Sequence, residues 1–444
     1  MISIEGRITL GLDEFMLRLG HLLALSHVAV FVNRRPTRLE HDFGTFITRF
    51  CEISEEQNGA VAEYLEVKGL CASPGPAGRS GGRKAYRYPD LEVVRDETAR
   101  SDGRFEVRSR TGVPQVWWQD LCLSDARMES CLGGVTMGAK SGSSTGISHI
   151  INWAVILGLL NRDMSPSVEV QMLARLRPKA IGLPGENPYC LSAADRTVLG
   201  YLLLRDDLDL FVRFGGEILR AEAPIGKTTG ARLFGTAVKR LSGDAERERG
   251  VSHRAQFRVF EQVKELKRAQ RKKRESPLGS SSTAWHRASS RLESYVDLGL
   301  VAKQSKGNAA RFKYIYYPTE LFRAVCESLQ KATSSTEWLE GDFIEFFGGG
   351  GGRVGGLSEG VVRDLLKPVL AALERPIRLF PLEILSIGLS LQAPTLGQNI
   401  SIGDARRSLE TLARLRPDLA RVSRGARGER AEFISLDVER FSHA

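Results

Sequence analysis

Apolar residues between positions 281 and 296 recur at the spacing of an α-helix, with Trp285 and Tyr295 on the same side. The polar residues between them fall on the opposite side, so we expect one face to pack and the other to be exposed. Gly299 follows closely. Because glycine adopts positive φ at little cost, the pattern predicts that the helix ends there and passes into a strand.

A basic two-stranded hairpin is predicted next, with its tip at residues 306–308 and an aromatic second strand that includes Tyr314 and Tyr316. Helix, glycine turn and hairpin together resemble the recognition helix and wing of a winged helix-turn-helix domain. The resemblance implies a helix in the DNA major groove and a wing on the phosphate backbone. The DNA contacts that it implies are His286, Arg287, Ser290 and Arg291 on the helix, and Lys303, Lys306, Arg311 and Lys313 on the wing.

The same order of helix, glycine and basic hairpin is found near both ends of the chain. A helix that ends at Gly69 precedes one basic tip, and a helix that ends before Pro417 precedes the other. A variant copy ends its helix at Gly158 but has no compact basic tip, so we expect it to serve packing or protein contact. The basic residues of the two outer tips are Arg79, Arg83 and Lys84 in the first, and Arg424 and Arg427 in the last.

These patterns predict a mainly α fold with short β-hairpin wings (α+β), in which tandem winged-helix domains are joined by helical linkers. The five glycines at 348–352 leave no side chains to pack and are interpreted as a hinge or loop. The predicted domains are a winged helix at 1–97, a helical domain with the variant unit at 111–245, a basic helix with the central winged helix at 246–335, and a C-terminal winged helix at 357–444.

Positive charge is concentrated around the central unit. The 444 residues include 63 Lys and Arg against 53 Asp and Glu, a net charge of +10 that favours polyanionic partners. A helix is predicted from His253 to Glu275, with Phe257, Phe260 and Val263 on one stripe. The basic end of this helix can lie along the phosphates of a nucleic acid. The alternative interpretation is that it is a solvated helix end without a partner. Its basic run consists of Lys267, Arg268, Arg271, Lys272, Lys273 and Arg274.

Motifs for catalysis, cofactors and metals are not found. The six cysteines show no CxxC pair and the seven histidines no HxH or HExxH spacing, so we expect no metal. The segment 225–229 is similar to the end of a phosphate-binding loop, but that motif needs glycine where Ala221 stands. We therefore predict no cofactor, no catalytic residue and no enzymatic activity.

The predicted function is that of a DNA-binding protein with several winged helices that engages double-stranded DNA as one subunit of a larger protein assembly. We place it in the cytoplasm, associated with the nucleoid, and without a membrane span because apolar stretches such as 150–160 are too short. Antiviral defence, a mobile element or replication would suit such a chain. One alternative is an architectural adaptor similar to kleisin-like proteins, whose winged helices grip protein partners. Another is a DNA-processing enzyme with no recognisable motif.

Overall fold

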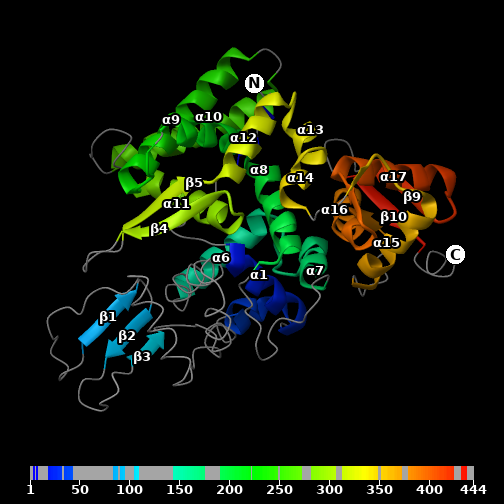
Figure 1. Cartoon of the computed structure of the whole chain (residues 1–444), viewed down its shortest axis with the longest axis horizontal. Helices are drawn as coiled ribbons and strands as arrows, with labels where there is room; N and C mark the ends of the chain where they lie inside the picture. The colour runs from blue at the N-terminus through cyan, green and yellow to red at the C-terminus, as the bar shows by residue number, and fades with distance from the viewer. Residues whose placement is uncertain are drawn as a thin grey trace.

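The structure, a computed structural model, is mainly helical with a few short strands (Figure 1). It describes residues 4–5, 7–8, 19–32, 35–43, 84–88, 91–95, 105–109, 144–175, 191–221, 223–248, 251–272, 282–306, 313–348, 352–372, 379–424 and 432–437. None of the helices in these ranges combines the length and the apolar character that crossing a membrane requires. The predicted fold class is confirmed at the level of a mainly α protein with short strands.

Helices outnumber strands among the described elements. The helical segments are α1 (Leu19–His27), η1 (Val28–Val32), η2 (Pro36–Arg38), α6 (Ser144–Ile156), α7 (Val168–Arg175), α8 (Ala193–Arg220), α9 (Lys227–Arg247), α10 (His253–Lys272), α11 (Ser282–Asp297), α12 (Glu320–Lys331), α13 (Ser335–Glu340), α14 (Phe343–Phe347), α15 (Glu359–Ala372), α16 (Leu382–Gln392), η3 (Ala393–Leu396) and α17 (Ile402–Leu415). The strands are β1 (Lys84–Tyr88), β2 (Leu91–Arg95), β3 (Phe105–Ser109), β4 (Val301–Lys306), β5 (Lys313–Pro318), β6 (Gly352–Val354), β7 (Leu379–Pro381), β8 (Gln398–Ile400), β9 (Ala420–Arg424) and β10 (Glu432–Leu436).

Helix α8 lies at the centre of the molecule (Figure 1). It is 28 residues long and begins with a capping box, in which Ser192 and Asp195 satisfy each other's backbone N–H groups. Helices α9, α12, α13, α14 and α16 all pack against it. Most of its surface is covered in this way, which explains why apolar residues occur on all of its sides.

The central unit contains the helix, turn and hairpin that the sequence predicts. Gly299 has φ of 74°, and the Leu300 N–H donates to the Tyr295 carbonyl at 2.9 Å, which closes the end of α11. Strands β4 and β5 then pair antiparallel. A third segment joins this sheet, because Ile225, just before α9, forms an antiparallel bridge with Tyr316 of β5. These local predictions are confirmed.

Packing in the central unit crosses the predicted boundary between residues 245 and 246. Helix α9 packs against α8 on one side and against α11 and α10 on the other. A Cβ at Gly230 of α9 would approach the Trp285 ring of α11 to 2.8 Å, so these two helices are in close contact. The packing groups α8 and α9 with the central hairpin.

The C-terminal unit consists of α15, β7, α16, α17 and the hairpin β9–β10. Its three strands are antiparallel in the order β7-β10-β9, so the short strand after the first helix pairs with the last strand. Helix α17 begins at Ser401, whose hydroxyl accepts from the Asp404 N–H at 3.0 Å. The predicted helix and hairpin of this unit are confirmed, whereas the tip with Arg427 lies outside the described residues.

Strands β1, β2 and β3 form an antiparallel sheet in the order β1-β2-β3. β1 follows the predicted basic tip, and Lys84, assigned to that tip, is instead the first residue of the strand, opposite Arg95 of β2 in the ladder. The sheet continues through β3, beyond the predicted boundary at residue 97. The helix expected before Gly69 and the tip residues Arg79 and Arg83 lie outside the described residues.

Candidate nucleic-acid interface

Three of the helix residues predicted to read DNA are buried, which corrects the expectation of an exposed polar face. Arg287, Ser290 and Arg291 of α11 are 4%, 1% and 1% exposed. The Arg291 guanidinium donates to both carboxylate oxygens of Asp207 on α8, at 2.6 and 3.0 Å. A bidentate pair of this kind holds the arginine inside the protein. The N–H groups that would bond to a guanine already donate to Asp207.

Lys303, predicted to contact DNA from the wing, is also buried. Its Nζ donates to Glu293 Oε1 at 2.7 Å, and the Tyr316 hydroxyl donates to the same oxygen at 2.5 Å. This pair joins α11 to both strands of the hairpin, so Lys303 stabilises the unit from within. His286 is the one predicted helix contact that is half-buried rather than buried.

The partners Asp207 and Glu293 were not predicted from the sequence. Asp207 stands in the acidic run Asp206–Asp209 within a helix that is otherwise rich in leucine. Buried carboxylates are rarely found without a cationic partner. An acidic run in an apolar helix is therefore the sequence feature that could have indicated a buried ion pair.

The β4–β5 ladder ends next to the predicted hairpin tip. Lys306 and Lys313 face each other across the last pair of the ladder, on both sides of the predicted tip. Arg311 lies outside the described residues.

A row of exposed cations on α9 was not predicted. Arg232, Lys239 and Arg240 are exposed, and their spacing places them on one side of the helix, away from the face that packs on α8 and α11. Arg240 also pairs with Glu217 of α8 at 2.9 Å. Segment 225–229, which is similar to the end of a phosphate-binding loop, leads into this helix. Ile225 is buried and Gly226 is the N-cap, so the segment forms the start of α9.

Helix α10 lies beside α9 at the same edge of the molecule (Figure 1). It packs on α9, with Ala255 and Val259 buried, whereas Phe257 and Phe260 of the predicted stripe are exposed and Val263 is half-buried against the core. The cations Arg254, Arg258 and Lys264 are exposed beside the two rings.

The basic run at the end of α10 is helical as far as it is described. The helix extends to Lys272, so positions 267, 268, 271 and 272 lie within it. Lys273 and Arg274 lie outside the described residues.

Charge on the two helices is strongly one-sided. Between positions 227 and 264, among the residues whose side chains are described, Glu246 is the one exposed acid. The exposed basic residues of this segment are Lys227, Arg232, Lys239, Arg240, Arg247, Arg254, Arg258 and Lys264. We call this set the α9–α10 basic face. Because like charges repel at this density, the surface favours a polyanion.

The C-terminal unit offers a smaller set of exposed arginines. Arg407 and Arg414 of α17 and Arg421 of β9 are exposed. Arg407 pairs with Asp404 of its own helix, and Arg406 joins α17 to Glu340 of α13 at 3.1 Å. Arg424, predicted to contact DNA, ends β9 opposite Glu432.

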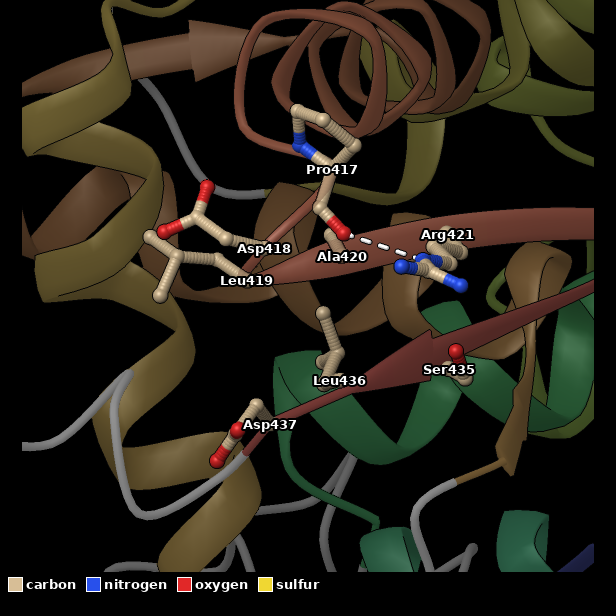
Figure 2. Close-up of a pocket in the computed structure, with 8 residues that line it drawn as sticks. All are labelled: Pro417, Asp418, Leu419, Ala420, Arg421, Ser435, Leu436 and Asp437. Atoms are coloured by element: carbon tan, nitrogen blue, oxygen red, sulfur yellow. Dashed lines mark hydrogen bonds between the residues drawn. The ribbon is translucent and has the colours of Figure 1, made fainter.

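A pocket of about 240 Å³ lies at the base of the β9–β10 hairpin (Figure 2). The Arg421 Nε donates to the Pro417 carbonyl at 3.0 Å on one wall. The carboxyl groups of Asp418 and Asp437 belong to the lining and would repel phosphate. Its lining residues are Pro417, Asp418, Leu419, Ala420, Arg421, Ser435, Leu436 and Asp437. We therefore leave the pocket out of the candidate interface.

Within the described ranges, His, Cys, Asp and Glu side chains form no group of three or more that could hold a metal ion. No protein-family model, curated protein or solved structure matches this chain.

Proposed function

We propose that this protein binds double-stranded DNA through the α9–α10 basic face. The observation that carries the proposal is the excess of exposed cations on that face, with Glu246 as the one exposed acid among its described side chains. Lysine and arginine that lie along a duplex displace condensed counterions, and this gives affinity whatever the base sequence. The basic run at the end of α10 extends the track.

The strand and helix order supports a winged-helix architecture for the C-terminal unit. Helix α15, strand β7, helices α16 and α17, and the hairpin β9–β10 follow in the order of a winged helix, and β7 pairs with β10. Helix α17 would be its recognition helix, and Arg407, Arg414 and Arg421 its exposed cations. This unit would supply a second DNA contact.

The central unit has a comparable order, in which α8, Ile225, α9, α11 and the β4–β5 hairpin follow one another and α10 is inserted. Its recognition-like helix α11 is buried, so we assign α11 to packing and leave DNA contact in this unit to α9, α10 and the hairpin tip. Joining this unit to the C-terminal one would raise affinity through effective concentration. In this proposal the chain acts as a DNA-engaging subunit of a larger assembly.

The test is DNA affinity over a salt series. We expect the triple variant Arg254→Gln, Arg258→Gln, Lys264→Gln to bind duplex DNA more weakly and with a shallower salt dependence. Each lost phosphate contact removes about 0.9 from the slope of log K against log salt, so the slope should fall by up to about 3 between roughly 50 and 200 mM salt. Fluorescence anisotropy with a labelled duplex measures both quantities.

A matched control removes three exposed cations elsewhere, by Arg323→Gln, Lys331→Gln and Lys367→Gln on α12 and α15. The net charge changes equally in both triple variants, so a difference between them reports position and not total charge. Equal slopes for the two would contradict the proposed face. Absence of duplex binding at about 50 mM salt, together with a protein partner retained at high salt, would favour the adaptor alternative.

A further inference from the structure

Two phenylalanine rings of α10 are exposed beside cations of the α9–α10 basic face. Phe257 is 59% exposed and Phe260 is 37% exposed, and their spacing of three residues places them on neighbouring positions of one helical turn. The neighbouring cations are Arg254 and Arg258 on the preceding and same turns, and Lys264 one turn further, whose Nζ contacts Glu261 Oε1 at 3.0 Å. Exposed rings within a basic helix combine a flat apolar surface with positive charge.

We propose that α10 binds single-stranded nucleic acid, with bases stacked on Phe257 and Phe260 and the phosphates of the same strand held by the adjacent cations. This inference rests on the proposed function, since it names the form of nucleic acid that the same face takes. Aromatic rings beside a basic track are how proteins bind single strands without sequence preference, because every base has a π-face. The rings therefore select for unpaired bases, and the cations supply affinity for both single-stranded and double-stranded nucleic acid.

A duplex alone does not account for the rings. Its bases are stacked on one another inside the helix, so a phenylalanine on a convex protein helix would meet only sugar and phosphate. An acidic amphipathic helix of a partner protein is the other ligand of matching charge, but such helices dock by anchors spread over two or more turns in a groove. On α10 the exposed rings occupy one turn, whereas the described exposed cations extend from Arg254 to Lys264, about 15 Å along the helix. Such a row of cations matches the phosphate backbone of a single strand of nucleic acid better than it matches a short protein helix.

The experiment compares the full-length chain with the double variant Phe257→Ala, Phe260→Ala by fluorescence anisotropy. The probes are an oligothymidine of about 20 nucleotides, longer than the 4 to 16 that one binding module covers, and a duplex of the same length. We expect each ring to contribute about five- to tenfold to single-strand affinity, the low end of base–aromatic stacking. Duplex affinity should change by less than about twofold, because the cations remain.

Two further variants keep the outcome interpretable. Leu396→Ala removes an exposed apolar side chain of 50% exposure from η3 and should leave both affinities unchanged. The double variant Phe257→Leu, Phe260→Leu keeps apolar area but removes the π-face, so it should lose most of the single-strand affinity. Circular dichroism of each variant checks that the helices are retained.

An unchanged single-strand affinity in the alanine variant, or full affinity in the leucine variant, would overturn the inference and assign the rings to an apolar protein contact. An equal loss on both probes would also overturn it. If the wild-type chain binds duplex with the expected salt dependence and does not bind the oligothymidine, the inference fails and the proposed function stands. If it binds neither probe, the proposed function fails.

Discussion

The ion pair between Arg291 and Asp207 lies in the core, and both side chains are almost fully buried. Removal of one partner leaves the other charge buried and without compensation. We expect Arg291→Ala to lower the free energy of unfolding by about 3 to 5 kcal/mol, as is found when a buried pair is broken. Urea unfolding followed by circular dichroism measures this change.

A double variant separates charge from packing at this position. Arg291→Met with Asp207→Leu removes both charges and keeps apolar volume, so it should be close to the wild type in stability or above it. The duplex affinity of folded Arg291→Ala should equal that of the wild type. A fall as large as that of the α10 triple variant would show that Arg291 contacts DNA.

Cys326 on α12 is 5% exposed, and burial raises the pKa of its thiol to about 12. The thiolate is the form that reacts with alkylating agents, and at pH 8 only about one thiol in ten thousand is ionised at such a pKa. We expect Cys326 to resist iodoacetamide at pH 8 in the folded protein and to react once urea unfolds it. Peptide mass spectrometry identifies the labelled site. Labelling of the folded protein at the rate of a model peptide would contradict the burial of this thiol.

The turn between α11 and β4 depends on one backbone conformation. Gly299 has φ of 74°, which a residue with a Cβ adopts only at a cost of about 1 to 2 kcal/mol. We expect Gly299→Ala to lower the free energy of unfolding by that amount, measured by urea titration. Gly158 ends α6 with the same φ, and Gly158→Ala should behave alike.

Gly360 provides the control, because it lies in the first turn of α15 and an added Cβ would meet no atom within 4 Å. Its replacement by alanine should stabilise the protein by up to about 1 kcal/mol through helix propensity. A loss at Gly360 equal to that at Gly299 would mean that helix ends, and not positive φ, explain the effect.

The C-terminal unit is held to the rest of the molecule at α8. Glu383 of α16 accepts from the Tyr201 hydroxyl at 2.7 Å and from Arg205 at 3.2 Å, and α16 also packs on α7. We expect Glu383→Ala to weaken this junction by about 1 to 3 kcal/mol, because it leaves two donors without their shared acceptor. Hydrogen exchange should then speed up in α16 and α17 before it does in α9 and α11.

The matched control is Glu359→Ala, which removes a carboxylate that pairs with Arg416 inside the C-terminal unit. Its effect should stay local to α15 and α17. If Glu359→Ala and Glu383→Ala accelerate exchange in the same amides, the Glu383 contacts do not hold the units together. The junction also fixes the distance between the two proposed DNA contacts, so a weakened junction should lower avidity for long duplexes more than for short ones.

The local structure of this protein follows from its sequence because its causes are local. Helical spacing of apolar residues predicts α11, Gly299 predicts its end, and the alternation around Tyr316 predicts β5. The same rules predict α17 and the β9–β10 hairpin. A helix is also expected from His253 to Glu275, and the structure describes it from His253 to Lys272.

Only the tertiary structure decided which face of each helix is covered. Periodicity separates two faces but does not say which of them meets another element. Arg291 is buried because its partner Asp207 lies 84 positions earlier on α8, and no rule of spacing links the two. Phe257 is exposed, whereas the smaller side chains Ala255 and Val259 of α10 are buried. The sequence by itself thus determined the helices and hairpins, and long-range packing moved the candidate interface from α11 to α9 and α10.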